Sequence, residues 1–262
     1  MAFQSLLYDT DSSGVATITM NRPGVRNAFN TEMIAELTAA FTQANSDDEI
    51  NVIQLDAAGE HFSAGADLNW MKSMAGMNFA ENVADANNLA TLMHTIDQST
   101  KPTIACVNGA AFGGALGLIA CCDIAIAGLD AKFCLSEVKL GLVPAVISPY
   151  VIRAIGQRNA NRYFLTAETF DARTAVDMGL IHQATETSEL HSTTKRIINQ
   201  LLCNGPNAVK TAKALIRQVS SSDLDDTLMQ FTAELIARVR VSEEGQEGLA
   251  AFLEKRKPTW NK

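Results

Sequence analysis

The sequence predicts an α/β fold followed by a helical C-terminal region, and three observations lead to this prediction. Strand-like apolar segments alternate with helical segments as far as about Ser188, a pattern typical of parallel strands joined by helical crossovers. Beyond Ser188 only helical periodicity continues, punctuated by Pro206 and Pro258. At 262 residues the chain can form one large α/β unit with an appendage. We therefore expect an α/β core over residues 1–200 and a helical region over residues 201–262 that packs against other subunits.

The individual elements follow from local patterns. Alternating polar and apolar residues at 5–9 and 14–20 flank a turn that ends at Gly14, which predicts a β-hairpin. Asn30 is expected to cap a helix. The predicted apolar face of that helix comprises Met33, Ile34, Leu37, Ala40, Phe41 and Ala44. Further strands are expected at residues 52–57, 102–107, 124–127 and 132–135. Further helices are expected from about residue 67, over about 79–95 and over 113–122.

Composition and charge argue against several classes of protein. A net charge of −8 and a pI near 5.0 disfavour broad nucleic-acid binding, which needs a basic face. The N-terminus lacks the basic and apolar regions of a secretory signal. The longest apolar stretch, residues 104–127, is interrupted by Asn108, several glycines and Asp123, so no membrane span is expected. We expect a cytoplasmic protein.

The cysteines and histidines show no metal-binding or disulfide pattern. None of the five cysteines forms a C-x-x-C pair, and four lie in apolar stretches, where free cysteines usually act as small core residues. The four histidines have no spacing typical of a metal site or a catalytic triad. We therefore expect no metal site. These residues are Cys106, Cys121, Cys122, Cys134, Cys203, His61, His94, His182 and His191.

Two segments share an architecture that could bind an oxygen anion. Residues 61–68 (H-F-S-A-G-A-D-L) and residues 108–117 (N-G-A-A-F-G-G-A-L-G) each follow a predicted strand, contain small residues and lead into a helix. The start of a helix offers unpaired backbone N–H groups and a partial positive charge. Either segment alone is typical of an ordinary strand-to-helix loop, in which Asp67 would cap the helix. Together they could supply two backbone donors to one oxygen, as an oxyanion hole requires.

The blocks F-S-A-G-A-D-L, K-P-T-I-A-C-V-N-G-A-A-F-G-G-A-L-G-L, C-D-I-A-I-A and F-L-E-K-R-K-P, in this order, resemble the crotonase (enoyl-CoA hydratase/isomerase) superfamily. The resemblance runs from Arg22 to Lys257, nearly the whole chain. It implies a crotonase-type spiral of ββα units, a C-terminal helical trimerisation region and a homotrimer or a dimer of trimers. It also implies an acyl-CoA thioester as the substrate, with coenzyme A as part of that substrate and no permanently bound cofactor.

The same resemblance implies roles for individual positions. The backbone N–H groups of Ala66 and Gly114 match the two oxyanion donors. The positions that match the coenzyme A site are Arg26, Ala28, Ala64, Asp67, Leu68 and Lys255. Lys255 is expected to reach coenzyme A from a neighbouring subunit, although a solvated surface charge is an equally good explanation of Arg26 or Lys255 taken alone.

Glu137 matches the second catalytic glutamate of two-glutamate enoyl-CoA hydratases, and its largely apolar neighbours should raise its pKa. The first glutamate would fall three residues after Gly114, where this chain has Gly117. A two-glutamate hydratase holds and activates water with the pair. With glycine at position 117, we expect the water to occupy the space that the missing glutamate side chain vacates. A single glutamate at the Glu137 position is also the arrangement of enoyl-CoA isomerases.

The loop after Glu137 departs from the family pattern as well. Residues 143–153 read V-P-A-V-I-S-P-Y-V-I-R. In combination, the blocks G-G-A-L-G-L-I-A-C-C-D-I-A-I-A, F-C-L-S-E-V-K-L-G-L-V-P-A and S-P-Y-V-I-R-A-I-G most resemble bacterial methylglutaconyl-CoA hydratases of leucine breakdown and their isohexenylglutaconyl-CoA relatives. Both substrates carry a second carboxylate. Candidate partners for that carboxylate are Lys72, Ser148 and Arg153.

These observations predict an enzyme that adds water reversibly to the 2,3-double bond of a branched enoyl-CoA. Glu137 would transfer the proton while Ala66 and Gly114 hold the enolate oxygen. One alternative is an enoyl-CoA isomerase that uses the same glutamate, and another is an acyl-CoA-binding homologue without catalytic activity. A serine hydrolase is disfavoured because the chain has no G-x-S-x-G elbow.

Overall fold

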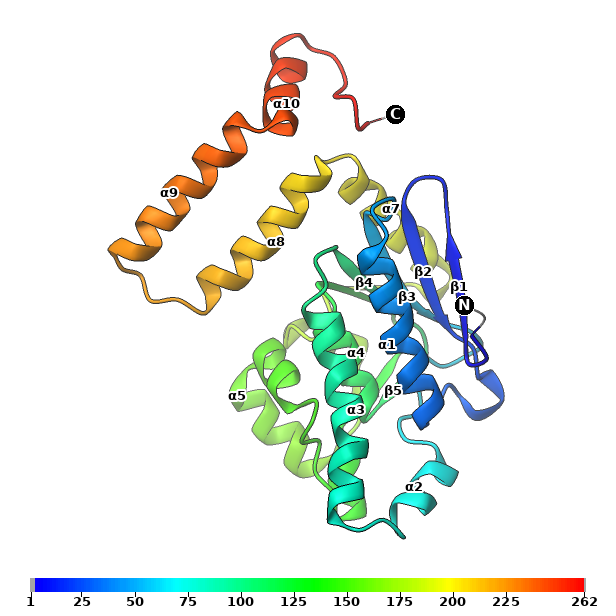
Figure 1. The fold of residues 1–262 in the computed structure, drawn as a ribbon. Helices are drawn as coiled ribbons and strands as arrows, with labels where there is room; N and C mark the ends of the chain where they lie inside the picture. The colour runs from blue at the N-terminus through cyan, green and yellow to red at the C-terminus, as the bar shows by residue number, and fades with distance from the viewer. Residues whose placement is uncertain (1–2, 262) are drawn as a thin grey trace.

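A computed structural model describes residues 3–261 of the chain, and its centre is a six-stranded sheet (Figure 1). The strands lie in the order β1-β2-β3-β4-β6-β9. β1 and β2 form the predicted antiparallel hairpin, and the remaining neighbours are parallel. The strands are β1 (Leu6–Thr10), β2 (Val15–Met20), β3 (Val52–Ala57), β4 (Thr103–Val107), β6 (Ile124–Gly128) and β9 (Gln183–Thr185). The predicted α/β alternation with parallel strands is therefore confirmed.

Helices cover both faces of this sheet. On one face lie α1 (Thr31–Ser46) and α3 (Phe79–Asp97), which pack against each other. α1 begins as predicted, because the side chain of Asn30 accepts a hydrogen bond from Met33 N–H, and all six residues of its predicted apolar face are buried. The other face packs against α7 (Leu190–Leu202) through a separate apolar cluster that includes Val52, Ile104 and Ile198.

A second, three-stranded sheet lies beyond the carboxyl ends of the main strands. It consists of β5 (Ala110–Phe112), β7 (Lys132–Cys134) and β8 (Phe170–Asp171), with β7 in the middle. The remaining helical segments between β3 and β9 are α2 (Leu68–Met74), α4 (Gly114–Cys121), the 3-10 turn η2 (Glu137–Leu140), α5 (Ser148–Thr166) and α6 (Ala172–Asp177). α4 packs against α3 on one side and α5 on another, and it also contacts β5.

Three C-terminal helices extend from the α/β body in Figure 1, and the first of them is tied to that body by the Lys213–Asp123 ion pair and by Arg217, which donates to Asp97 C=O. They are α8 (Pro206–Ser220), α9 (Asp226–Val241) and α10 (Glu243–Leu253), and α10 contacts both α8 and α9. Large apolar side chains on these helices are exposed, including Met229, Val241 and Phe252. Within residues 3–261, no helix has the length and apolarity that a membrane span requires.

Candidate active site

The two small-residue segments singled out in the sequence lie side by side. Ser63 pairs with Ala111 in a parallel bridge, with Ser63 N–H donating to Ala110 C=O at 3.0 Å and Phe112 N–H donating to Ser63 C=O at 2.9 Å. Both segments follow the carboxyl ends of neighbouring parallel strands, β3 and β4. The parallel sheet therefore brings together residues that are far apart in sequence.

The N–H groups of Ala66 and Gly114, the two expected oxyanion donors, are not used in the backbone pairing around them. Phe29 bonds to the residues on either side of Ala66: its N–H donates to Gly65 C=O and its C=O accepts from Asp67 N–H. This pairing turns the N–H of Ala66 away from Phe29. Gly114 is the first residue of α4, where an N–H has no intrahelical partner. Across residues 3–261, neither N–H has a hydrogen-bond acceptor.

The glycines before these two donors allow the loops to come close. Gly65 has φ +90° and Gly113 has φ +56°, both in the region that favours glycine. A Cβ added to Gly65 would lie 3.1 Å from Phe112 C=O, and a Cβ added to Gly113 would lie 3.9 Å from the Cα of Gly65. A larger residue at either position would therefore strain the backbone, and at Gly65 it would also crowd Phe112 C=O in the neighbouring loop.

Glu137 lies directly over this pair of turns. A Cβ added to Gly113 would be 3.2 Å from Glu137 Oε1, so the carboxyl group covers the glycine that precedes the Gly114 donor. β7 positions it: Phe112 pairs with Cys134, and Gly113 N–H donates to Cys134 C=O at 2.9 Å. Three residues later the chain turns into η2, which begins at Glu137. The structure thus brings together the three predicted catalytic positions, Ala66, Gly114 and Glu137.

The carboxyl group of Glu137 is half-buried and incompletely hydrogen-bonded. Its Oε2 atom is buried and has no hydrogen-bond partner within residues 3–261. Burial raises the pKa of Glu137 above the usual 4.5, and a hydrogen bond from its own backbone offsets only part of this effect. A carboxyl group with a raised pKa in a cleft is suited to accepting and returning a proton.

The space beside Gly117 is filled by apolar side chains. A Cβ added to Gly117 would lie 2.3 Å from Ile147 Cγ2, 2.8 Å from Ile147 Cβ and 3.0 Å from Met93 Sδ. Gly117, Ile147 and Met93 are all buried. The expectation that water occupies a vacated space at Gly117 is therefore wrong, because Ile147 takes that space. Ile147 and Met93 therefore form an apolar wall at Gly117, and Glu137 is the carboxylate that lies beside the two donor loops.

Asp67 holds the start of α2, and an arginine that the sequence analysis assigned no role supports it. Asp67 Oδ1 accepts from Asn69 N–H at 2.8 Å, and Oδ2 accepts from Arg22 at 2.9 Å. These contacts hold the pKa of Asp67 below its usual range. Arg22 also donates to Ala28 C=O, so it ties the segment before Phe29 to the helix that follows Ala66. Both oxygens of Asp67 are engaged within the protein, which makes its role a supporting one.

Replacing Asp67 with alanine should destabilise the protein and also lower turnover. Loss of the cap alone costs about 0.5–2 kcal/mol, and freeing α2 also releases the backbone next to the Ala66 donor. The matched control is Asp225→Ala, which removes the cap of α9, where Asp225 accepts from Leu228 N–H. Urea unfolding and kcat should separate the two: both variants lose stability, but only Asp67→Ala loses activity. Equal activity in the two variants would contradict a positioning role.

The positions predicted to contact coenzyme A lie mainly on one side of the two loops. Ala64 N–H donates to Arg26 C=O at 2.9 Å, which joins the Arg26–Ala28 segment to the oxyanion loop. Ala28 is buried, whereas Arg26 and Leu68 are exposed. Lys255 follows α10, and Figure 1 shows α10 and α2 at opposite ends of the molecule. Within one chain, Lys255 is therefore not part of this group.

The three candidates for binding a second substrate carboxylate differ in their contacts. Arg153 forms an ion pair with Asp97 and lies over the ring of Tyr150. Ser148 donates to Ala145 C=O at 2.7 Å. Lys72 is exposed on α2, and the part of the chain that the structure describes gives it no ion-pair partner.

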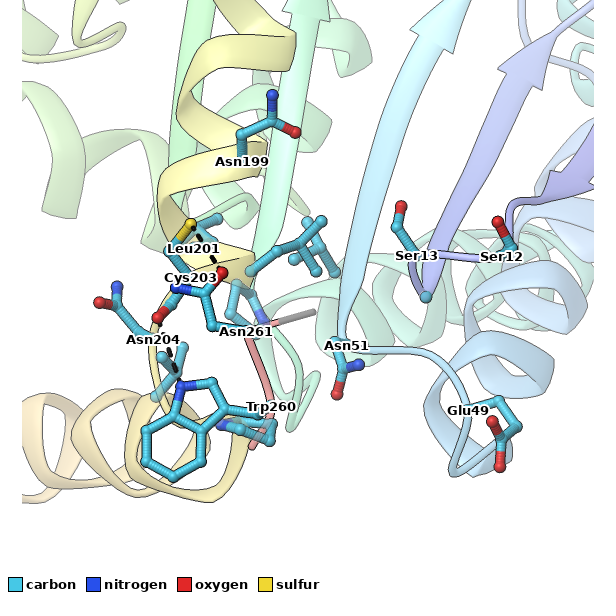
Figure 2. Close-up of a pocket in the computed structure, with 16 residues that line it drawn as sticks. Ser12, Ser13, Glu49, Asn51, Asn199, Leu201, Cys203, Asn204, Trp260 and Asn261 are labelled. Atoms are coloured by element: carbon cyan, nitrogen blue, oxygen red, sulfur yellow. Dashed lines mark hydrogen bonds between the residues drawn. The ribbon is translucent and has the colours of Figure 1, made fainter. Parts of the chain in front are cut away.

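A well-formed cavity lies elsewhere in the molecule. It has a volume of about 660 Å³ and is lined by residues such as Ser13, Asn51 and Trp260 (Figure 2). Its lining includes Gly14, Val52 and Pro102, which lie at or before the amino ends of the parallel strands. None of the predicted site residues lines it. The convergence of backbone donors and a carboxyl group locates the candidate active site at the opposite edge of the sheet.

Comparison with known proteins gives consistent results. Residues 10–262 match the family described as enoyl-CoA hydratase/isomerase. A solved enoyl-CoA hydratase from Shewanella pealeana shares 49% identity and superposes with a TM-score of 0.94, covering 98% of this chain and 96% of that one. The short-chain-enoyl-CoA hydratase of Clostridium acetobutylicum is 34% identical over 93% of this chain and 92% of its own length. The trans-2-decenoyl-[acyl-carrier-protein] isomerase of Streptococcus mutans is 30% identical over 98% of each chain.

Proposed function

The chain belongs to the enoyl-CoA hydratase/isomerase family and has its α/β crotonase fold with C-terminal helices, and from this premise we propose that it adds water reversibly to the 2,3-double bond of an enoyl-CoA. The observation that carries the proposal is the convergence of Glu137 with the unpaired N–H groups of Ala66 and Gly114. The two donors hold the thioester oxygen as it becomes an enolate oxygen, and each is worth about 3–4 kcal/mol in the transition state.

One carboxylate can deliver both parts of the water molecule. Glu137 takes a proton from water as the oxygen forms a bond to C3, and the π electrons move onto the thioester to form the enolate. The protonated Glu137 then gives that proton to C2, and the enolate collapses to the 3-hydroxyacyl thioester. The apolar wall of Ile147 and Met93 contributes no proton-transfer group, so the same carboxyl group acts in both steps.

Two features support an acyl-CoA substrate. Exposed apolar side chains follow the site residues in the chain: Leu68 comes shortly after Ala66, and Leu140 and Val143 come shortly after Glu137. Such side chains can cover an acyl or pantetheine segment. Two of the relatives described above are named as hydratases of enoyl-CoA.

The proposal is tested by incubating the purified protein with crotonyl-CoA and following the loss of the enoyl-thioester absorbance. Conversion to the 3-hydroxyacyl product by the wild type, and not by Glu137→Gln, is the expected result. Absence of turnover on every 2-enoyl-CoA, with coenzyme A thioesters still bound, would favour an acyl-CoA-binding homologue instead.

The rate should depend on pH through Glu137. Hydration starts from the ionised carboxylate, and burial raises the pKa of this group above 4.5. The value of kcat/KM should therefore fall as the pH drops through a pKa higher than 4.5 and should be level above it. A pH profile of kcat/KM for crotonyl-CoA measures this limb, and an acid limb at or below 4.5 would contradict the proposed base.

We further propose that the preferred substrate is a branched enoyl-CoA with a second carboxylate, similar to 3-methylglutaconyl-CoA. The proposal is supported by the sequence resemblance of three blocks, the last of them at residues 148–156, and by Lys72, the candidate cation with no ion pair among residues 3–261. Lys72→Ala should raise KM for 3-methylglutaconyl-CoA but leave KM for crotonyl-CoA unchanged. If Lys72→Ala changes KM equally for both substrates, or changes neither, the proposed preference for a substrate with a second carboxylate is contradicted.

A specific observation also favours a second candidate activity. The wall at Gly117 leaves the site with a single carboxylate, which suffices to move a proton between two carbons without water. One relative is named as an isomerase. Conversion of a 3-enoyl-CoA to its 2-enoyl isomer without a hydroxyacyl product would identify this activity.

We propose that residues 201–262 form an oligomerisation region and that the protein assembles as a homotrimer or a dimer of trimers. The exposed apolar side chains of α9 and α10 support this proposal, since such surfaces are usually covered. The position of Lys255, far from α2 in its own chain, is suited to contacting coenzyme A bound to a neighbour. Light scattering on the purified protein should give a mass of three or six chains, and a monomer would contradict the proposal.

A further inference from the structure

Three side chains with metal-binding atoms meet between the central sheet and α7, away from the proposed catalytic groups. They are Asp56 near the end of β3, Cys106 near the end of β4 and His191 at the start of α7. Their ligand atoms all lie within 4.8 Å of one another. The spacing of cysteines and histidines predicts no metal site, because these three residues are far apart in the chain and meet only through the fold.

The register of the sheet fixes two members of this cluster. β3 and β4 are parallel and pair Leu55 with Ala105, so the next residues, Asp56 and Cys106, stand beside each other. Cys106 belongs to the apolar cluster under α7, which shows that this face of the sheet points toward the helix. Asp56 is held in place by Ala57 N–H and by the side-chain amide of Gln54. Such secondary contacts orient the ligands of a metal ion.

The distances fit metal coordination better than a hydrogen bond to the carboxylate. His191 Nδ1 lies 3.6 Å from Cys106 Sγ, a length that a sulfur hydrogen bond also allows, and 3.5 Å from Asp56 Oδ2. A good N–H···O hydrogen bond spans about 2.7–3.2 Å. With Zn–S near 2.3 Å and Zn–N and Zn–O near 2.0–2.2 Å, a tetrahedral zinc site has S···N edges of about 3.6 Å and N···O edges of about 3.4 Å. The His191 imidazole is placed at these edge lengths from both partners.

The chemistry of the donors also selects the ion. One thiolate, one imidazole and one carboxylate suit a borderline-soft ion such as Zn²⁺, and three protein ligands leave a fourth position for water. His191 is on the surface, with 73% of its side chain exposed, so an ion can enter from solvent. A nucleophilic Cys-His-Asp arrangement is the rival explanation. It is disfavoured because Cys106 is fully buried, so its thiol presents no surface that a substrate could reach.

We propose that Asp56, Cys106 and His191 form a zinc-binding site that joins α7 to the strands that carry the two catalytic loops. Binding displaces the Cys106 proton to solvent and closes the tetrahedron with one water molecule. β3 leads into the Ala66 loop and β4 into the Gly114 loop, so an ion at this position fixes the strand ends from which both loops start. This is a structural role that does not depend on the proposed hydration.

The test uses the full-length protein, stripped of metal with a chelator and titrated with Co²⁺ as a spectroscopic probe. We expect one Co²⁺ per chain, a thiolate-to-cobalt charge-transfer band and the visible bands of tetrahedral cobalt, all removed by adding Zn²⁺. Zn²⁺ should also raise the temperature of thermal unfolding. Calorimetric titration gives the zinc affinity.

His191→Ala decides the proposal, because this residue is exposed and its loss should leave the fold intact. It should weaken zinc binding by at least 10- to 100-fold, the loss typical of removing even an indirect partner of a metal site. Cys106→Ser should abolish the charge-transfer band. The matched controls are His94→Ala and Cys203→Ser, both exposed and outside the cluster. No charge-transfer band in the wild type, or equal zinc affinity in His191→Ala and His94→Ala, would overturn the proposal.

Discussion

Replacing Glu137 with glutamine should lower kcat for hydration by about 100- to 10,000-fold, the usual contribution of a positioned acid–base group. Glutamine keeps the size of the side chain above Gly113 but cannot take a proton from water or return one to C2. Binding of coenzyme A thioesters should be unchanged, because the proposed coenzyme contacts lie on other segments. Stopped assays with concentrated enzyme measure the residual kcat, and calorimetry measures binding.

The stability of the same variant provides a second test. Burial gives Glu137 a raised pKa in the folded state, so folding favours its protonated form and the ionised carboxyl group destabilises the protein as the pH rises through that pKa. Glu137→Gln should therefore be at least as stable as the wild type at neutral pH. The control is Glu49→Gln, exposed and near the opposite edge of the sheet, which should change neither kcat nor stability. A fully active Glu137→Gln protein would refute the assignment.

Placing a glutamate at Gly117 should destabilise the protein severely and should not improve hydration. The first added atom already overlaps Ile147, and overpacking of this kind costs about 1–3 kcal/mol. A carboxylate buried among Ile147 and Met93 without a partner adds several kcal/mol more. Since a typical domain has only about 5–15 kcal/mol of stability, we expect little folded Gly117→Glu protein. Soluble yield and urea unfolding measure the effect.

A double-mutant cycle separates the steric cause from a general intolerance of the helix. Gly117→Ala should lose stability, and combining it with Ile147→Gly should recover part of that loss, with a coupling of about 0.5–3 kcal/mol. Gly24→Glu is the matched control, because nothing lies within 4 Å of a Cβ at that position. A Gly117→Glu protein as stable as Gly24→Glu would mean that the position opens into the site, contrary to the packing described above.

Local patterns predicted much of the fold because several elements have strong internal signals. The pattern predicts β3 over residues 52–57 because it is a short, almost continuously buried apolar run, and it predicts the apolar face of α1 residue by residue because that face has helical spacing. α5, β8 and β9 were not predicted. α5 contains Gly156 at φ 72° and few buried residues, while β8 and β9 are two and three residues long and depend on pairing with distant strands.

The site shows the same division. Family resemblance predicts the positions of Ala66, Gly114 and Glu137. The strand-to-helix turns explain why the backbone N–H groups of Ala66 and Gly114 have no acceptor among residues 3–261. The contact between Ile147 and Gly117 could not be predicted, because it joins two segments that meet only when α4 packs against α5. The roles of Arg22 in holding Asp67 and of His191 beside Cys106 also depend on contacts between distant segments.

The most direct test of the central claim is isotope incorporation. The wild-type protein is incubated with a 2-enoyl-CoA and, separately, a 3-enoyl-CoA in water enriched in oxygen-18, and the products are analysed by mass spectrometry. If Glu137 hydrates the double bond without a second glutamate, the 3-hydroxyacyl product carries one oxygen-18 atom, and Glu137→Gln forms almost none. Formation of unlabelled 2-enoyl-CoA from the 3-enoyl substrate, with no hydroxyacyl product from either, would contradict hydration and establish isomerisation.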